Sequence, residues 1–322
     1  MFLAIPSYGL ANRLRTLASA KVMADALDKD LRLVWIAHRD LPHTRWLDLF
    51  EPSSEIVELP MSRLRHWFWL KPWSSRLAGA HRLHALGGLP FDNKAAHELL
   101  HTFTTHENTP FACADRLQTK PCSIHAECSV PIDPRWKHVS LRGQFNYKLV
   151  DMDDAEYLRR MRAFYLSLRP RAAVDAMVDV LTPEFGTDTI GVHFRQTDNR
   201  HSFYEGLIPT TSYFGLIDRA LDERPSARLF VAADTRASRE AARQRYGARV
   251  LKHPTDVPDA DSGLSNRYST VGQRAALADM IALSRTSFIV GTRFSSFTYV
   301  AAVLGGVPLV EAGMEMTPNP LT

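Results

Sequence analysis

The second half of the chain alternates between buried-strand and helix patterns, and no other feature of the sequence constrains the fold as strongly. Short apolar runs are separated by stretches with helical periodicity, an order typical of a parallel sheet covered by helices. It predicts a doubly wound α/β domain. The predicted strands are 189–194, 227–233, 249–253, 287–292 and 307–312, separated by predicted helices at 212–223, 238–246, 275–285 and 297–305.

The first half follows the same order less regularly. Strand patterns at 1–5, 31–37, 55–59 and 138–143 accompany a helical pattern at 12–27. Residues from about 60 to 135 are irregular and rich in Trp, His and Pro, as expected for an insertion on a sheet domain. A helical stretch at 154–181, interrupted at Pro170, is expected to carry the chain between two domains. We therefore predict an N-terminal domain at 1–155 and a C-terminal domain at 170–322.

Composition narrows the class of protein. Hydrophobic residues make up 45% of the 322 residues and charged residues 23%, which is typical of a globular chain. A net charge of +4 favours anionic partners but is too small to indicate nucleic acid. The three cysteines lack CxxC spacing, the start looks like a strand rather than a secretion signal, and no apolar stretch approaches membrane-spanning length. A cytoplasmic protein is expected.

Polar residues follow several predicted strands, where ligands bind in open α/β sheets. Arg195 comes directly after the strand at 189–194, and its guanidinium suits phosphate. Ser295 and Ser296 begin a helix, where free N–H groups and hydroxyls hold anions, although capping is the commonest role of serine there. A diphosphate leaving group is a suitable ligand for these two strand ends, because both offer groups that bind phosphate. In the alternative, Asp198 pairs with Arg195 in a structural salt bridge.

Four segments together resemble the GDP-fucose-dependent fucosyltransferase superfamily, which includes nodulation, α1,6- and protein O-fucosyltransferases. HFRQTDN resembles the family's His-x-Arg-Arg-x-Asp motif, and LFVAADTRASREA resembles its Val-Ala-Thr-Asp-Asp strand and helix. LADMIALSRTSFIVGTRFSSFTYVAA resembles its Asp…Ser-Ser-Phe motif, and YGLANRLR its loop after the first strand. The matched segments lie in the second half and the first thirty residues, and about 40 to 150 is unmatched.

The resemblance implies a GT-B-like fold, in which two Rossmann-like domains face a cleft. It also implies an inverting, metal-independent glycosyltransferase that moves fucose from GDP-fucose to a glycan, glycolipid or other hydroxyl acceptor. No cofactor is expected besides the donor, which is GDP-fucose or another GDP-sugar. The C-terminal domain would bind the GDP-sugar. His193 would lie beside the guanine, Arg195 would bind the β-phosphate, and Asp279 would accept hydrogen bonds from guanine N1 and N2.

The same resemblance assigns the diphosphate to Ser295, Ser296 and Phe297. Asp234 would lie near the nucleotide, although it could instead be the N-cap of the following helix. Asn12 and Arg13 match the loop after the first strand; capping of the first helix and lining of the cleft both remain open for them.

The sequence departs from the family pattern at two positions. Gln196 stands where a second arginine is usual, and Thr235 replaces the second aspartate of an acidic pair. The loss of one cation at Gln196 favours an alternative, a nucleotide-sugar-binding homologue without transfer activity. The general base that deprotonates the acceptor would be Glu205 or Asp198.

Two further segments suggest other functions. HELLH at 97–101 matches the zinc-binding His-Glu-x-x-His pattern of metallopeptidases, but the extended pattern fails because Thr104 occupies the glycine position. The basic and aromatic stretch at 61–84 could contact a membrane surface or receive an acceptor, or it could be an insertion packed on the N-terminal domain. No nucleic-acid-binding motif accompanies it, so a glycosyltransferase without a metal site remains the prediction.

Overall fold

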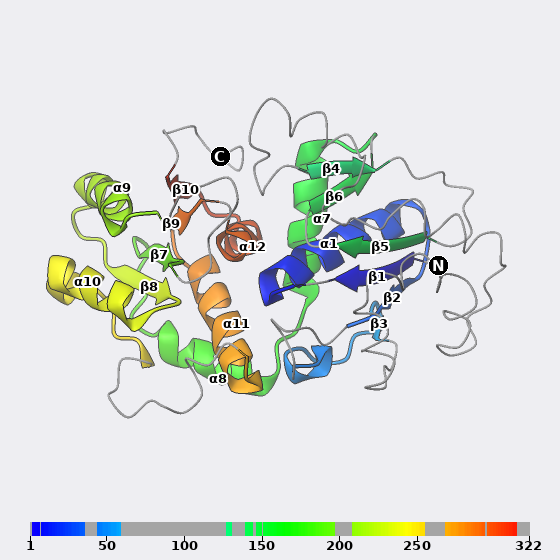
Figure 1. Ribbon diagram of the computed structural model, residues 1–322, viewed down its shortest axis with the longest axis horizontal. Helices are drawn as coiled ribbons and strands as arrows, with labels where there is room; N and C mark the ends of the chain where they lie inside the picture. The colour runs from blue at the N-terminus through cyan, green and yellow to red at the C-terminus, as the bar shows by residue number, and fades with distance from the viewer. Residues whose placement is uncertain are drawn as a thin grey trace. The chain divides into compact units, whose positions relative to one another are not determined.

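The computed structural model describes residues 2–6, 8–35, 44–58, 127–130, 139–143, 146–149, 151–196, 208–254, 268–293 and 295–313. The chain divides into two compact units, Met1–Arg169 and Pro170–Thr322. Each unit contains a four-stranded parallel sheet accompanied by helices (Figure 1). The predicted α/β class with parallel sheets is therefore confirmed.

The sheet of the first unit has the order β3-β2-β1-β5. β1, the central strand, places Phe2 beside Leu31 on one side and Val139 on the other. All five residues of β1 are buried, as expected for a parallel strand covered on both faces. The strands are β1 (Phe2–Pro6), β2 (Leu31–Leu33), β3 (Val57–Glu58) and β5 (Val139–Gly143).

A second, two-stranded parallel sheet in this unit consists of β4 (Glu127–Val130) and β6 (Asn146–Leu149). The sequence patterns did not predict it, because two four-residue strands are too short to show periodicity.

The Ser19 hydroxyl connects helix α1 (Leu10–Ala26) with β6 and with α7 (Asp154–Ser167). Ser19 Oγ accepts from the Tyr147 amide at 3.0 Å, donates to Arg15 O at 2.8 Å and lies 2.8 Å from Tyr157 Oη.

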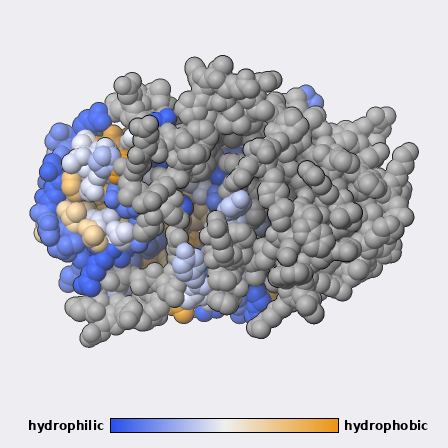
Figure 2. Space-filling view, in the orientation of Figure 1, coloured by the Kyte–Doolittle hydropathy of each residue, from blue (hydrophilic) through white to orange (hydrophobic). Residues whose placement is uncertain are grey.

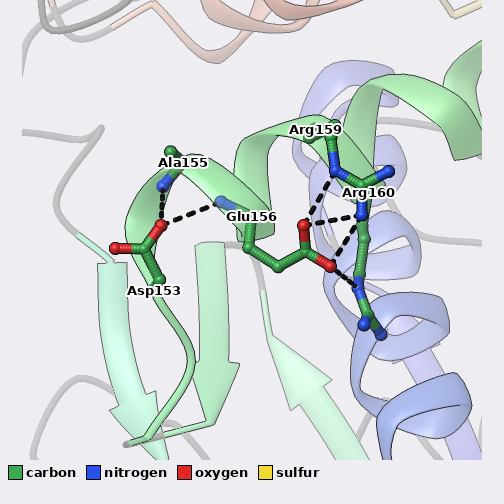
Figure 3. A network of polar contacts seen from close by, with 5 residues as sticks. All are labelled: Asp153, Ala155, Glu156, Arg159 and Arg160. Atoms are coloured by element: carbon green, nitrogen blue, oxygen red, sulfur yellow. Dashed lines mark hydrogen bonds and ion pairs between the residues drawn. The ribbon is translucent and has the colours of Figure 1, made fainter.

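Helix α7 begins with a satisfied N-terminus (Figure 3). Asp153 Oδ1 accepts hydrogen bonds from the backbone N–H groups of Ala155 and Glu156 at 3.0 and 3.1 Å. These are the hydrogen bonds that an N-cap aspartate usually makes. One turn on, Arg159 and Arg160 donate to the Glu156 carboxylate. These hydrogen bonds, Arg160 first and Arg159 second, lower the pKa of Glu156. The helix ends at Ser167 and α8 (Ala172–Leu181) follows, so the predicted interruption at Pro170 is confirmed.

The sheet of the second unit has the order β10-β9-β7-β8, and every pair is parallel. A short 3-10 turn, η3 (Gly247–Arg249), follows helix α10 (Arg236–Tyr246). In the first unit a similar turn, η1 (Trp46–Asp48), precedes β3. The strands are β7 (Ile190–Phe194), β8 (Leu229–Ala233), β9 (Phe288–Thr292) and β10 (Leu309–Ala312), and the helices are α9 (Thr210–Glu223), α10 (Arg236–Tyr246), α11 (Thr270–Ser284) and α12 (Ser296–Gly305).

The strand order of this sheet reverses between β7 and β9. From β7 the chain passes through α9 to β8 on one side, and β9 then pairs with the other side of β7. α9 and α10 lie on one side of the sheet, and α8, α11 and α12 lie on the other (Figure 1). Ligands of doubly wound sheets bind outside the carboxyl ends of the strands at such a reversal. The topology alone therefore predicts a ligand site at the carboxyl ends of β7 and β9.

One predicted strand of the second unit is wrong. Residues 249–253 form a single bridge, between Val250 and Leu229, with one backbone hydrogen bond from Leu251 N to Leu229 O at 2.8 Å. Pro254 follows closely and has no N–H to extend a ladder. The segment nevertheless runs beside β8 and delivers His253 to a buried position.

Candidate functional site

The Thr292 hydroxyl connects the ends of β7 and β9. It accepts from the Arg195 backbone N–H at 3.1 Å and from Tyr213 Oη at 2.9 Å, and it donates to His193 O at 2.9 Å. All of its hydrogen-bonding capacity is used. Thr292 O in turn accepts from Ser295 N at 3.0 Å. One residue thus fixes the start of the chain after β7 relative to the turn before α12.

His193, at the end of β7, is buried and held by α12. Its Nδ1 lies 2.8 Å from Thr298 Oγ1, and its ring stacks on Phe297 with centroids 4.7 Å apart. Gly291 makes this approach possible, since a Cβ at that position would collide with the Thr298 side chain. Burial, assisted by the nearby Arg195 charge, lowers the pKa of His193 to about 4, against opposing effects of Asp234 and Asp279. The imidazole is therefore neutral at neutral pH.

Asp234, at the end of β8, binds the backbone beyond β7. Both of its carboxylate oxygens accept from Gln196 N at 2.9 Å. The N-cap of α10 is Thr235, whose Oγ1 accepts from Ser238 N at 3.1 Å, so the N-cap alternative for Asp234 is wrong. The Gln196 side chain donates to Ile208 O at 3.1 Å. The half-buried Arg195 lies between these anchored positions.

The N-terminus of α12 differs from a capped helix start. Ser295 occupies the N-cap position, yet its side chain makes no capping bond, and it is only 1% exposed. Within the described residues, its Oγ has no hydrogen-bond partner. Ser296 is also buried and begins the first turn, whose N–H groups have no partner inside the helix. This start combines the positive end of a helix dipole with a buried hydroxyl, an arrangement suited to an anion.

Asp279 lies in α11 and contacts His253. Its Oδ1 is 2.9 Å from His253 Nε2, and the His253 ring stacks on Phe230 with centroids 6.1 Å apart. The charges of Asp234 and Asp279 both oppose the lowering of the His193 pKa. Because Phe230 belongs to β8, the contact with His253 places the Asp279 carboxylate beside the strand that pairs with β7.

Two of the predicted residues lie in the first unit, inside α1 rather than at its cap. The N-cap of α1 is Gly9, so the capping alternative for Asn12 and Arg13 is wrong. Arg13 is fully buried, donates from Nε to Tyr8 O at 2.7 Å and places its guanidinium 4.8 Å from the Trp35 ring centroid. Arg13 therefore orders the loop between β1 and α1.

Several predictions fall outside the described residues. These are both candidate bases, Asp198 and Glu205, the HELLH segment at 97–101 and the stretch at 61–84. Within the described ranges, no group of three or more His, Cys, Asp or Glu side chains is arranged to hold a metal ion. None of the helices in those ranges is long and apolar enough to cross a membrane.

A hollow of about 620 Å³ lies between the C-terminal ends of α9 and α10. Because the helices of a doubly wound sheet run opposite to the strands, these C-terminal ends lie at the edge of the sheet away from His193. Both of its arginines already have partners: Arg245 pairs with Asp218 at 2.5 Å, and Arg249 donates to Pro225 O at 2.6 Å. The surface over these helices is mostly hydrophilic (Figure 2). This hollow therefore offers less to a ligand than the α12 start.

Sequence reasoning missed three residues that shape the site, namely Tyr213, His253 and Thr298. Burial raises the pKa of Tyr213 to about 12, so its hydroxyl stays protonated and donates to Thr292. His253 ends the segment predicted as a strand, and inspection of every strand end would have found it. Tyr213 and Thr298 lie inside helices, where the sequence shows only apolar periodicity around them.

Comparison with known proteins gives structural matches and no sequence matches. No protein-family model matches the sequence, and no curated protein matches it. The structure of NodZ α-1,6-fucosyltransferase soaked with GDP-fucose is 17% identical, with a TM-score of 0.56 and 99% of each chain covered. A second NodZ structure, from Bradyrhizobium, has a TM-score of 0.53 at 17% identity, again with 99% of each chain covered.

Two other fucosyltransferases show the same likeness. A mutant of Arabidopsis thaliana FUT1 in complex with GDP is 16% identical, with a TM-score of 0.54, and the match covers 96% of this chain and 69% of that one. POFUT1 in complex with GDP is 12% identical, with a TM-score of 0.50 and coverage of 97% and 99%. The chain therefore has the mixed α/β fold of solved fucosyltransferases, as the sequence resemblance implied, and the arrangement of two domains about a cleft stays a prediction.

Proposed function

We propose that the protein is a glycosyltransferase that moves fucose from GDP-fucose to a hydroxyl acceptor. The observation that carries this proposal is the buried Ser295 hydroxyl, which has no partner among the described residues and lies at the strand reversal, where the backbone N–H groups of Ser295 and Arg195 both bind Thr292. It is supported by the fold, which the chain shares with fucosyltransferases solved in complex with GDP and GDP-fucose.

The leaving diphosphate would be held at the α12 start. Ser295, Ser296 and the first-turn N–H groups supply hydrogen-bond donors, and the Arg195 guanidinium supplies a positive charge. Transfer of the sugar releases GDP, so negative charge grows on the β-phosphate in the transition state, where preorganised donors are most effective. These groups can neutralise that charge themselves, so we propose a transfer that needs no metal.

The nucleoside would lie along the ends of β7 and β8. His193 and Phe297 form a stacked, neutral surface, and Asp279 offers a carboxylate to the base. Guanine presents two adjacent donors, N1–H and the N2 amino group, which match the two oxygens of a carboxylate. Adenine presents no such pair on this edge, and therefore guanine is the base we propose.

The acceptor would attack the anomeric carbon from the side opposite to the diphosphate, with inversion. A carboxylate must take the proton of the acceptor hydroxyl, and Asp198 or Glu205 is proposed for this step. Both belong to the segment whose two ends are joined by the hydrogen bond from Gln196 to Ile208. Asp234 fixes the first of those ends through Gln196 N.

A nucleotide-sugar-binding protein without transfer activity is the second candidate. It is favoured by Gln196, because its amide is occupied by Ile208 O and adds no positive charge to the site. Binding and turnover separate the two candidates. A protein that binds GDP-fucose yet leaves it intact with every acceptor would be the second.

The first experiment is calorimetry of the full chain with GDP, UDP and ADP, each with and without EDTA. We expect GDP to bind at least tenfold more tightly than the other two, with no effect of EDTA. Equal affinities would contradict the proposal. Labelled GDP-fucose is then incubated with a panel of acceptor glycans, and transfer to any of them identifies the enzyme and its acceptor class.

A further inference from the structure

The pair formed by His253 and Asp279 has an unusual order of exposure. The His253 side chain is 6% exposed and the Asp279 side chain 17%. In a catalytic His–carboxylate pair, the imidazole faces the substrate and the carboxylate lies behind it. Here the imidazole lies behind and the carboxylate is nearer to the surface. The arrangement is therefore unsuited to proton transfer by His253. It is suited to a hydrogen bond by which His253 holds the Asp279 carboxylate in one orientation.

His253 is itself held in place from two directions. Its ring stacks on Phe230, a buried residue of β8, with an interplanar angle of 28°. The backbone before it is hydrogen-bonded to β8 through Leu251 N and Leu229 O at 2.8 Å. Its Nε2 therefore meets Asp279 Oδ1 from a fixed position. Since only a hydrogen-bearing Nε2 can donate to a carboxylate, this nitrogen carries the proton.

A fixed partner matters because an aspartate carboxylate turns easily about its last bond. That torsion is broad and nearly two-fold, unlike the staggered torsions of aliphatic side chains. Two parallel hydrogen bonds to a planar base require the carboxylate to lie in the plane of the base. One hydrogen bond from behind, to Oδ1, selects that rotation and leaves Oδ2 and the second lone pair of Oδ1 for the base.

We propose that His253 is a positioning residue that fixes the Asp279 carboxylate for recognition of the two-donor edge of guanine. This role rests on the proposed binding of a guanine nucleotide. It assigns base specificity to a pair of residues, one of which belongs to no motif of the sequence. Loss of the His253 donor should loosen the carboxylate and weaken GDP more than a nucleotide that offers only one donor.

The test compares GDP with inosine diphosphate, which lacks the 2-amino group, by calorimetry on the full chain. His253→Phe keeps a ring against Phe230 and removes the donor, whereas His253→Gln places an amide N–H near the position of Nε2. We expect His253→Phe to bind GDP about tenfold more weakly and to lose most of its preference for GDP over inosine diphosphate. His253→Gln should retain most of both. Thermal unfolding of each variant verifies that it is folded.

The outcomes separate this role from the proposed function. If the wild type binds GDP but His253→Phe keeps the same preference for GDP over inosine diphosphate, the role of His253 is wrong and the proposed function stands. If Asp279→Asn also keeps that preference, the base is recognised elsewhere and the role is again wrong. A wild type that binds no guanine nucleotide overturns the proposed function and this role together.

Discussion

Two hydroxyl side chains at the turn between β9 and α12 lie three residues apart and have opposite environments. Thr292 Oγ1 makes three hydrogen bonds, to Arg195 N, Tyr213 Oη and His193 O. Ser295 Oγ makes none within the described residues, although the residue is only 1% exposed. Both are buried polar groups, yet only the first has hydrogen-bond partners among the residues that the structure describes.

This difference separates structural from ligand-binding polar groups. A buried hydroxyl without a partner is unfavourable by about 1–3 kcal/mol, so its retention needs a compensating role. A bound anion would supply the missing partner of Ser295. Thr292, whose capacity is already used, can only position other groups. We therefore expect substitution of Thr292 to affect stability, and substitution of Ser295 to affect binding.

Replacement of Thr292 by valine should have the largest effect on stability. Thr292→Val preserves the shape but leaves an N–H, a carbonyl and a tyrosine hydroxyl without their partner in a buried region. We expect a loss of about 4 kcal/mol in the free energy of unfolding of the second unit, measured by urea denaturation. Thr292→Ser, which keeps the hydroxyl, is the matched control. Equal loss in both variants would show that packing of the methyl group matters more than the hydrogen bonds.

Acid should weaken the second unit through His193, which lies next to this hydroxyl cluster. Its pKa of about 4 in the folded chain is below the usual value of 6.5, so the unfolded chain binds more protons between these values. The free energy of unfolding should therefore fall as the pH drops from about 6.5 to 4, by up to about 3 kcal/mol from this group. Urea denaturation at pH 7, 6, 5 and 4 measures the change.

The control for the acid effect is His193→Asn, whose amide can still reach Thr298. Nearby carboxylates also titrate at acidic pH, so the informative quantity is the difference between the two proteins. The wild type should lose more stability than the variant between pH 6.5 and 4. Parallel pH profiles would mean that His193 is not the group responsible.

Most of the second unit's fold could be predicted from sequence, because strong local patterns determine it. The apolar runs that became β7, β8, β9 and β10 are separated by periodic helices, and a parallel sheet with both faces covered follows. The pattern failed at 249–253, where an apolar run bounded by basic residues forms only one bridge. Whether this segment forms a strand depends on the hydrogen bonds that the neighbouring backbone offers, and the periodicity of the sequence contains no information about them.

The site could be predicted only where its residues follow strands. His193, Arg195 and Asp234 end or follow β7 and β8, and Ser295 follows β9. Which partner each side chain finds was not predictable: Asp234 binds the Gln196 backbone instead of capping α10. Contacts between segments that are distant in sequence, such as that of His253 with Asp279, depend on the folded arrangement and leave no local signal.

Ser295→Ala should separate binding from stability more cleanly than any other substitution at this turn. Its hydroxyl has no hydrogen bond to lose within the part of the chain that the structure describes, so we expect the unfolding free energy not to fall, and to rise by up to about 1–3 kcal/mol as the unpaired hydroxyl is removed. GDP binding should weaken about tenfold, the effect of one hydrogen bond to a charged group. Calorimetry and urea denaturation of the same preparation give both quantities.

The matched control for Ser295 is Ser287→Ala, at the opposite end of β9. Ser287 Oγ donates to Thr189 O at 3.0 Å, so this variant should lose stability and bind GDP like the wild type. Ser295→Ala should show the reverse. If it too is destabilised while GDP binding is unchanged, the Ser295 hydroxyl is a structural group and the α12 start is not the diphosphate site.

A capped helix start gives the smallest expected effect and completes the comparison. Asp153→Ala removes the oxygen that accepts from Ala155 N and Glu156 N at the start of α7 (Figure 3), which should lower the unfolding free energy of the first unit by about 1 kcal/mol. Asp151→Ala, an exposed change two residues before the cap, is the control for loss of charge. Neither variant should alter GDP affinity, because a cap already satisfied by its own helix has no ligand to bind. If Asp153→Ala weakened GDP binding as much as Ser295→Ala, a satisfied cap and an open one would be equivalent. The lack of a partner for the Ser295 hydroxyl among the described residues would then not indicate an anion site.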